Sequence, residues 1–332
     1  MRKRHTIEQL LPTSLPMNLT FLDRKTVGEV PNLSRLNDFG SLTLYDTTTP
    51  DQVQERLQDQ QVVIINKVIM DREAIDSANA LQLICVAATG MDNVDSAYAE
   101  EKGVAVKNVS GYSTPSVAQL TWTMILTLLQ RPNHFNEFVY SGNYARHDIF
   151  TYFDPPFGEL GSKRLGIIGL GTIGQRVAAI GRAFGAEVVY YSSSGKHDHA
   201  DYPRLSLDEL LSTSDIVSIH APLTEHTKNL LTYPQLQQMP DHALLINTGR
   251  GGIVNEADLA RAIDEGIIGG AGIDVFTEEP IPQDHPYLSV RHRDRLLLTP
   301  HLAWASVEAR TRLMDGVYEN IREFVASKED NP

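Results

Sequence analysis

The sequence predicts an α/β protein of two domains, each a doubly wound parallel sheet with helices on both faces. Three observations lead to this prediction. The chain has 332 residues, which suits two domains. Apolar strand-like runs alternate with helical stretches from residue 17 onward, as is typical of parallel sheets covered by helices. A glycine-rich turn, residues 169–174, joins a predicted strand to a predicted helix near the middle of the chain.

In the first half of the chain, apolar runs predict strands and helical patterns lie between them. The strands are expected at residues 19–22, 62–65, 83–86 and 104–106, and the helices at 49–59, 71–78 and 116–129. The last helix is apolar and ends before Arg131-Pro132, because the residue before a proline avoids the helical conformation. We expect this helix to connect the two domains.

The second half repeats the alternation and predicts a doubly wound sheet of about six strands. The strands are expected at 165–168, 187–191, 216–220, 243–246, 270–273 and 296–298, and the helices at 175–184, 207–211, 233–238 and 256–265. A terminal helix is expected at 306–325, after Thr299-Pro300. If Pro300 marks a hinge, this helix returns to the first domain, which is then discontinuous.

The predicted domains are therefore a flavodoxin-like substrate domain and a Rossmann cofactor domain. The substrate domain is expected at residues 17–107 plus 299–332, and the cofactor domain at 108–298. Residues 1–16 are expected to form an N-terminal extension. Their basic start is followed by no sustained apolar segment, so they do not have the pattern of a secretory signal.

The composition narrows the classes of partner. A net charge of −13 argues against nucleic acid and anionic membrane, which both bind basic surfaces. No apolar run is long enough to cross a bilayer. The single cysteine, Cys85, allows no internal disulfide, and its apolar neighbours predict a buried structural thiol. No His, Asp and Glu cluster has metal-ligand spacing, so no metal is expected. We expect a cytoplasmic protein.

The run Gly169-x-Gly171-x-x-Gly174 predicts dinucleotide binding because a strand precedes it and a helix follows it. Gly169 allows the tight turn, Gly171 lets a pyrophosphate approach the backbone, and Gly174 lets helix and strand pack closely. The helix N-terminus then offers free N–H groups and a positive dipole end to the anion. The alternative is a purely structural glycine turn.

Three polar residues follow predicted strands, where ligands of open α/β sheets bind. They are Arg250, Glu279 and His301. Arginine can grip the carboxylate and polarise the carbonyl of a 2-oxo acid. Histidine can protonate the forming alkoxide, and a nearby carboxylate favours its charged form. A nicotinamide cofactor would supply the hydride.

Each of these residues also has a simpler interpretation. Arg250 could bind only a phosphate or a surface acid, Glu279 could be solvated beside Glu278, and His301 could cap the helix at Ser306. His220 ends a predicted strand and could line the adenine side of the cofactor or only pack in the core. Together, above a dinucleotide fold, the three polar residues favour catalysis.

At this point the chain resembles the D-isomer specific 2-hydroxyacid dehydrogenase family, over nearly everything from residue 17 to about residue 325. Six motifs carry the resemblance, in family order and separation: residues 88–95 (ATGMDNVD), 169–174 (GLGTIG), 220–224 (HAPLT), 247–251 (NTGRG), 274–280 (DVFTEEP) and 299–301 (TPH). The resemblance implies an NAD(P)-dependent oxidoreductase of 2-oxo and D-2-hydroxy acids. It also implies a homodimer, with a cleft between the domains that closes on substrate.

The resemblance assigns roles at matched positions. Arg250 matches the arginine that binds the substrate carboxylate and carbonyl, His301 the general acid or base, and Glu279 its partner. Thr89 and Gly90 match the loop whose N–H groups receive the substrate carboxylate. The positions implied for the cofactor are Gly169, Gly171, Thr172, Ile173, Gly174, Ser192, Lys196, His220, Ala221, Pro222, Thr248 and Asp274, the last at the nicotinamide carboxamide. Related formate dehydrogenases carry glutamine in place of Glu279, so the Glu–His pair favours a hydroxy acid.

The sequence that should determine the coenzyme specificity differs from the usual NAD-binding pattern. The acid that should follow the second strand of the cofactor domain is missing, and Ser192 stands there with Lys196 nearby. Serine does not repel a 2′-phosphate, but no arginine attracts one. We therefore expect weak discrimination, with NAD slightly preferred and NADP possible. A ratio of catalytic efficiencies above about a hundredfold for either coenzyme would contradict this expectation.

The substrate is expected to be small and polar. The sequence around His301 and Trp304 resembles the glycerate dehydrogenase and hydroxypyruvate reductase branch, as does the aromatic stretch 148–153, which we expect to reach the active site. Trp304 could roof the substrate pocket or pack against a partner subunit. Hydroxypyruvate and glyoxylate are the favoured substrates, and reduction is the favoured direction.

Two other functions remain open for this scaffold. One is a non-enzymatic NAD(H)-sensing binding protein, because the family includes transcriptional corepressors that keep the three catalytic-type residues. The other is a phosphite dehydrogenase. The acidic charge balance and the absence of long disordered tails disfavour the sensor.

Overall fold

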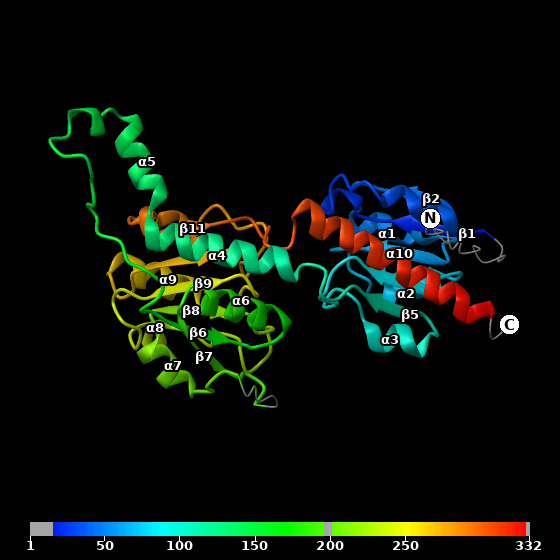
Figure 1. Cartoon of the computed structure of the whole chain (residues 1–332). Coiled ribbons are helices and arrows are strands. Elements are labelled where there is room, and N and C mark those ends of the chain that lie inside the picture. Colours follow the sequence, from blue (N-terminus) through cyan, green and yellow to red (C-terminus); the bar gives the residue numbers. More distant parts are fainter. Residues whose placement is uncertain (1–15, 196–198, 200, 330–332) are drawn as a thin grey trace, which may run out of the picture. The chain divides into compact units, whose positions relative to one another are not determined.

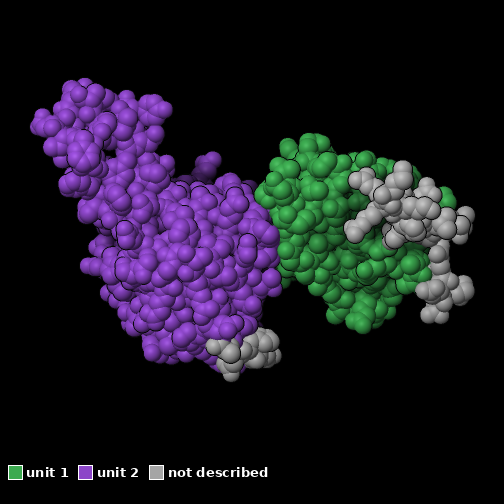
Figure 2. All heavy atoms as spheres, viewed as in Figure 1, with its two compact units in different colours: residues 1–113, 305–332 green, residues 114–304 purple. Residues whose placement is uncertain are grey.

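The computed structural model describes residues 16–195, 199 and 201–329. One unit comprises the residues up to Ser113 together with those from Ala305 onward, and the other comprises Thr114–Trp304 (Figure 2). We refer to them as unit 1 and unit 2. The domain boundaries predicted at 107/108 and 298/299 stay predictions, and the predicted extension lies outside the described residues except for Pro16.

Unit 1 contains a five-stranded parallel sheet with the order β2-β1-β3-β4-β5 (Figure 1). This is the flavodoxin-like order, so the predicted fold of this part is confirmed. Its strands are β1 (Met17–Phe21), β2 (Gly40–Leu44), β3 (Val62–Ile65), β4 (Leu83–Val86) and β5 (Ala105–Asn108). Residues of β3 and β4 are buried throughout, as expected for central strands covered on both faces.

The helices of unit 1 begin at residues that satisfy free backbone N–H groups. They are α1 (Pro50–Leu57), α2 (Arg72–Ser77), α3 (Ser96–Glu101) and the C-terminal α10 (Val307–Glu329), with short 3₁₀ turns at Arg24–Thr26 and Leu33–Phe39. Asp71 accepts the N–H of Ala74 at the start of α2, and Thr49 with Gln52 forms a capping box before α1. α10 packs on β4 and β5, so both ends of the chain build this unit.

Unit 2 contains a six-stranded parallel sheet with the order β11-β10-β9-β8-β6-β7. Its strands are β6 (Arg164–Ile168), β7 (Glu187–Tyr191), β8 (Ile216–Ile219), β9 (Leu244–Asn247), β10 (Gly270–Ile273) and β11 (Leu296–Leu298). The chain passes from β6 to β7 on one side and then returns to β8 on the other side of β6. The order of strands therefore reverses at β6, which is where a doubly wound sheet binds its ligand. The predicted Rossmann fold is confirmed.

Helices cover both faces of this sheet. On one face, α4 (Thr114–Gln130) and α6 (Thr172–Ala183) pack through Trp122, Ile125 and Val177 onto Leu165 and Ile246. On the other face lie α7 (Leu207–Thr213), α8 (Tyr233–Leu236) and α9 (Glu256–Asp264), whose apolar side chains join a second buried cluster. Short 3₁₀ turns at Pro286–Ser289 and Arg293–Arg295 precede β11.

A segment of unit 2 extends away from the sheet (Figure 1). It begins with α5 (Pro132–Tyr140), continues through a 3₁₀ turn at Tyr144–Arg146 and ends near Phe157. We call residues 132–157 the aromatic arm. Its inner rings pack on one another, with Phe138 stacked on Tyr152 at 3.8 Å between ring centroids. Its outer apolar side chains are exposed, including Tyr140 at 82% and Phe150 at 89%.

The structure adds elements that the sequence patterns did not predict. β2 is an edge strand with largely exposed side chains, so it has no continuous apolar run. α3 is short, and α5 buries none of its residues. The prediction for Cys85 is confirmed: it lies buried in β4, and burial raises the pKa of its thiol to about 12. None of the described helices is both long and apolar enough to span a bilayer.

Candidate active site

The glycine turn after β6 has the geometry that a dinucleotide phosphate needs. Gly169 has a φ of +90°, and a Cβ there would lie 2.7 Å from the backbone nitrogen of Ala221. A Cβ on Gly174 would lie 2.3 Å from the carbonyl oxygen of Gly169. At Gly171, the N-cap of α6, a Cβ would meet nothing within 4 Å. The turn therefore requires glycine at its closed positions and leaves open space at the helix N-terminus, which fits a pyrophosphate.

The residues expected around the cofactor follow neighbouring strands at the carboxyl edge of the sheet. Ser192 follows β7, Ala221 and Pro222 follow β8, Thr248 follows β9, Asp274 follows β10, and Thr172 and Ile173 open α6. The hydroxyls of Thr248 and Thr121 lie 2.9 Å apart, so α4 fixes the position of Thr248. No acid follows β7, where three serines stand. Lys196 lies outside the described residues.

His220 lies beside the glycine turn and is half-buried, with its Nδ1 inside the protein. Its Nε2 is 2.9 Å from the Ser218 hydroxyl, and its Nδ1 has no hydrogen-bond partner among the described residues. Burial lowers the pKa of His220 to about 3, so the ring is neutral at physiological pH. The Nδ1 atom of His220 could accept or donate a hydrogen bond to a bound cofactor. The contacts of the ring agree equally well with a residue that only packs beside the glycine turn.

Acid should destabilise the protein through His220. Its folded pKa of about 3 lies below its ordinary value of 6.5, so the unfolded chain takes up a proton first as the pH falls. Between pH 6.5 and pH 3 this costs about 1.4 kcal/mol of stability per pH unit, or about 2 kcal/mol at pH 5. Urea unfolding at pH 7 and pH 5 should show that His220→Asn loses about 2 kcal/mol less than the wild type. The exposed His226→Asn is the control, and parallel losses in all three proteins would contradict this assignment.

The structure brings His301 and Glu279 into direct contact. The Nδ1 of His301 lies 2.6 Å from Oε2 of Glu279, and the two side chains are 26% and 29% exposed. The other oxygen of Glu279 accepts the N–H of Phe276 at 2.9 Å. Glu279 is therefore paired with His301 and held by its own loop, which argues against the simpler interpretation of a solvated surface pair.

The backbone of His301 is held in a left-handed conformation by Asp274. His301 has a φ of +51°, which non-glycine residues rarely adopt. Its N–H donates to the carbonyl of Asp274 at 2.8 Å, and the Asp274 carboxylate accepts the N–H groups of Leu302 and Ala303 at 2.9 Å each. Thr299 donates its hydroxyl to the same carboxylate. Burial raises the pKa of Asp274 even though these bonds oppose the shift. Asp274 thus fixes the His301 loop, a role that the sequence did not indicate.

Arg250 lies on a turn that the side chain of Asn247 holds through two hydrogen bonds to the backbone. The Asn247 amide donates to the carbonyl of Arg250 at 2.9 Å and accepts the N–H of Gly249 at 3.1 Å. The Arg250 guanidinium contacts the carbonyl of Gly249 at 2.9 Å. β9, β10 and β11 are neighbours, so Arg250, Glu279 and His301 follow the carboxyl ends of three adjacent strands. Sequence reasoning missed Asn247, although an Asn followed by glycine turns at the end of a strand is a usable signal.

The other predicted substrate residues are placed as follows. Thr89 and Gly90 follow β4 in unit 1, where the Thr89 hydroxyl donates to the carbonyl of Val109 at 3.2 Å. Trp304 is half-buried at the end of unit 2. The stretch 148–153 lies on the aromatic arm with Phe150 and Phe153 exposed. Its expected contribution to the active site stays a prediction.

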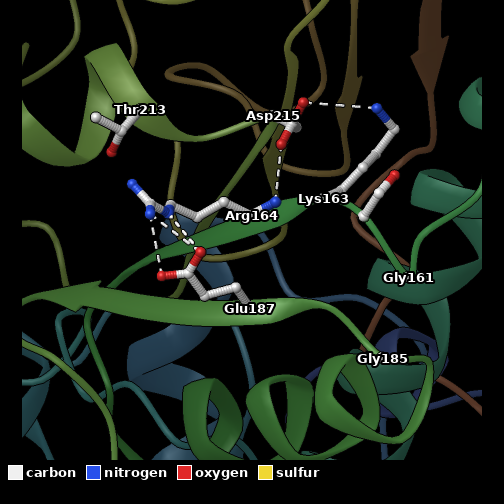
Figure 3. Close-up of a pocket in the computed structure, with 8 residues that line it drawn as sticks. Gly161, Lys163, Arg164, Gly185, Glu187, Thr213 and Asp215 are labelled. Carbon is white, nitrogen blue, oxygen red and sulfur yellow. Dashed lines mark hydrogen bonds and ion pairs between the residues drawn. The ribbon is translucent and has the colours of Figure 1, made fainter.

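A polar cavity of about 470 Å³ lies at the opposite edge of the same sheet (Figure 3). Its charged lining residues are already paired: Lys163 lies 3.5 Å from Asp215, and Arg164 makes two bonds of 3.1 and 3.0 Å with Glu187. Arg164 and Glu187 begin β6 and β7, so this cavity lies at the amino ends of the strands. Open α/β sheets bind their ligands at the carboxyl ends of the strands. We therefore place the candidate active site at the carboxyl ends and not at this cavity.

Comparison with known proteins agrees with this geometry. Residues 122–303 match the model of the D-isomer specific 2-hydroxyacid dehydrogenase, NAD binding domain. The glycerate dehydrogenase of Methylorubrum extorquens is 36% identical over 314 residues, covering 94% of this chain and 98% of the relative. The hydroxypyruvate reductase of Blautia hydrogenotrophica is 34% identical, covering 89% and 92%. The D-lactate dehydrogenase structure of Aquifex aeolicus, complexed with NAD and lactic acid, has a TM-score of 0.80 at 29% identity, covering 94% and 97%.

Proposed function

The chain belongs to the D-isomer specific 2-hydroxyacid dehydrogenase family, and we propose that His301, Glu279 and Arg250 carry out its reaction. That reaction is the NAD-dependent interconversion of a 2-hydroxy acid and the corresponding 2-oxo acid. The observation that carries the assignment is the 2.6 Å contact between His301 and Glu279. This contact orients the imidazole of His301.

The proposed roles follow from the contacts of each side chain. When bound, the reduced nicotinamide supplies a hydride to C2 of the 2-oxo acid. His301 gives the proton from Nε2 to the carbonyl oxygen, because Nδ1 is already engaged by Glu279. Arg250 binds the substrate carboxylate and polarises the same carbonyl. In the oxidative direction, neutral His301 accepts the hydroxyl proton. Thr89 and Gly90 are proposed to donate backbone N–H groups to the substrate carboxylate.

The proposed physiological substrate is a small, polar 2-oxo acid such as hydroxypyruvate or glyoxylate. The proposed physiological reaction is its reduction. The names of the glycerate dehydrogenase and hydroxypyruvate reductase relatives support this choice. Trp304, three residues beyond His301, is proposed to limit the size of the substrate side chain. Cytoplasmic localisation also stays a prediction.

Turnover of a panel of 2-oxo acids tests the proposed function. NADH and NADPH consumption would be followed with hydroxypyruvate, glyoxylate, pyruvate and phenylpyruvate. We expect hydroxypyruvate or glyoxylate to react fastest, and the two coenzymes to differ by less than about a hundredfold in kcat/KM because Ser192 neither repels nor binds a 2′-phosphate. Tight NADH binding without turnover of any 2-oxo acid would favour the sensor. NADH formation from phosphite and NAD would favour phosphite oxidation.

A second copy of this chain is the proposed partner of the aromatic arm. Tyr140, Phe150 and Phe153 are 82%, 89% and 63% exposed, which is unusual for aromatic side chains lying close together in sequence. A homodimer in which the arm packs against a second subunit would bury these side chains.

Light scattering should therefore give about twice the monomer mass of 36.9 kDa. Phe150→Asp places a charge in the proposed interface and should shift the mass toward the monomer. Ile69→Asp changes an apolar residue of unit 1 that is 64% exposed and should leave the dimer intact. A monomeric wild-type protein would overturn the proposal.

A further inference from the structure

A buried histidine and a half-buried glutamate lie beside the turn that carries Glu279. Glu256 is the first residue of α9, and His285 precedes the 3₁₀ turn Pro286–Ser289. One oxygen of Glu256 lies 3.1 Å from Nε2 of His285, and the other accepts the N–H of Thr277 at 2.8 Å. Glu256 thus connects a buried histidine to the backbone of the Glu279 turn.

The hydrogen bonds of His285 fix the orientation of its ring. Its Nδ1 accepts the N–H of Tyr287 at 3.3 Å, so the ring proton lies on Nε2 and is donated to Glu256. The side chain is only 3% exposed and packs on the rings of Phe276 and Tyr287, with centroids 5.8 and 4.9 Å away. His285 is therefore a rigid donor that holds one side of the Glu256 carboxylate in place.

The backbone of Phe276 and Thr277 is held on three sides. Phe276 donates its N–H to Glu279 at 2.9 Å, and Thr277 donates its N–H to Glu256. On the third side lies Gly251, the neighbour of Arg250, where a Cβ would approach the carbonyl oxygen of Phe276 to 1.9 Å. The position of this two-residue segment therefore sets the position of the Glu279 carboxylate relative to both His301 and the Arg250 turn.

We propose that Glu256 is a positioning residue: it fixes the Phe276–Thr277 segment and thereby directs Glu279 at His301. This inference rests on the proposed function of the His301–Glu279 pair. Glu256 does not reach the reacting atoms and acts only through the backbone of the turn.

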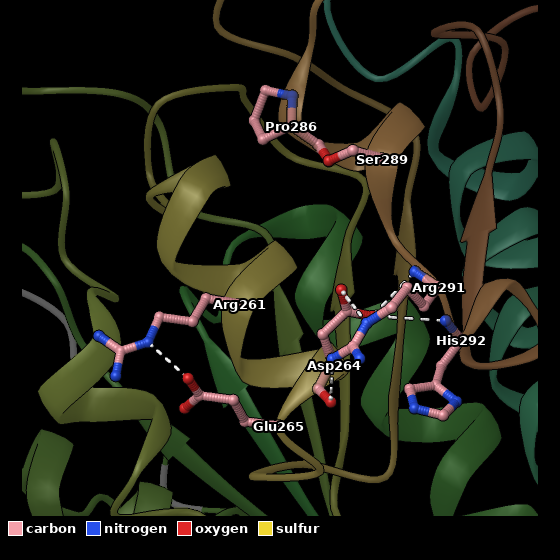
Figure 4. A network of polar contacts seen from close by, with 7 residues as sticks. All are labelled: Arg261, Asp264, Glu265, Pro286, Ser289, Arg291 and His292. Atoms are coloured by element: carbon pink, nitrogen blue, oxygen red, sulfur yellow. Dashed lines mark hydrogen bonds and ion pairs between the residues drawn. The ribbon is translucent and has the colours of Figure 1, made fainter.

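Steady-state kinetics of Glu256→Ala test the proposal. Losing the Thr277 contact lets the Glu279 turn shift, so kcat for the 2-oxo acid should fall about ten- to a hundredfold, while the KM for NADH stays unchanged. Glu256→Gln keeps an acceptor for the Thr277 N–H and should recover most of kcat. The matched control is Glu265→Ala at the far end of the same helix. There Glu265 pairs with Arg261 at 2.9 Å (Figure 4) and with the hydroxyl of Tyr233, away from the Glu279 turn, so its removal should leave kcat unchanged.

A second readout does not depend on turnover. Histidine rings labelled with ¹⁵N would be observed by ¹H–¹⁵N NMR, with the His301 signal assigned from its absence in His301→Asn. In Glu256→Ala the Nδ1 proton of His301 should lose the downfield chemical shift of a short hydrogen bond, because the displaced Glu279 carboxylate no longer lies 2.6 Å from Nδ1. A variant with the wild-type Nδ1 proton shift and the wild-type kcat would overturn the positioning role. If the wild type turned over no 2-oxo acid, the proposed function would fail and the NMR spectra would still decide the inference.

Discussion

Replacing His301 with asparagine should lower kcat for 2-oxo acid reduction about a thousandfold while NADH still binds. The variant removes the proton donor, and a positioned general acid contributes about 10²–10⁴-fold. Asparagine is the suitable replacement because it tolerates positive φ, and His301 has a φ of +51°. Alanine would strain the loop in addition to removing the imidazole, so its effect would be harder to interpret.

The measurement is steady-state kinetics with hydroxypyruvate or glyoxylate, together with NADH binding followed by fluorescence. His292→Asn serves as the control, because His292 is an exposed histidine of the same unit that contacts Asp264 at the surface (Figure 4). A His301→Asn enzyme that keeps more than about a tenth of the wild-type kcat would show that another group supplies the proton.

Replacing Arg250 should have an effect of similar size, expressed in kcat/KM for the 2-oxo acid. Arg250→Ala removes the proposed donor to the carboxylate and carbonyl of the substrate, and we expect a loss of about 10²–10³-fold, or about 3 to 4 kcal/mol. Arg250→Lys keeps the charge but loses the planar fork, so it should recover only part of that loss. If lysine restored full activity, charge alone would be the requirement.

The stability of Arg250→Ala shows whether the fold around the site stays intact. The Arg250 turn is closed by backbone and Asn247 contacts rather than by the guanidinium alone, so Arg250→Ala should unfold at the same urea concentration as the wild type. Arg261→Ala, a surface arginine that pairs with Glu265, is the matched control for activity. A large loss of stability in Arg250→Ala would mean that the lost activity reflects unfolding.

The sequence predicted the fold wherever strands are buried on both faces. β3 and β4 are unbroken apolar runs, and β8 and β9 contain one polar residue each, because both faces of these strands pack against helices. β2 was missed because its side chains are mostly exposed, and α5 because no residue of it is buried in the chain. Elements that are not covered lack the continuous apolar run by which the central strands were detected.

The sequence also pointed to the residues that follow strand ends, because position in an open sheet is itself a signal. It did not point to the residues that hold them. Asp274 was expected to contact the cofactor. It also fixes the His301 loop, through the N–H groups of Leu302 and Ala303, which are far from Asp274 in the sequence. Glu256 opens a helix and looks like an ordinary first-turn acid, favourable at the positive dipole end. Its contact with Thr277 becomes visible only when the two loops are folded together.

The burial of Cys85 has a practical consequence for spectroscopy. With its thiol pKa raised to about 12 and its side chain inside the sheet, it should not react with maleimides at neutral pH in the folded protein. The natural chain can then be treated as a thiol-free background for site-specific labelling. Cysteines introduced at Ile69 in unit 1 and Val139 on the aromatic arm, both exposed, would accept a donor and an acceptor dye. Energy transfer between the dyes would report how the distance between these positions changes as substrate and coenzyme are added.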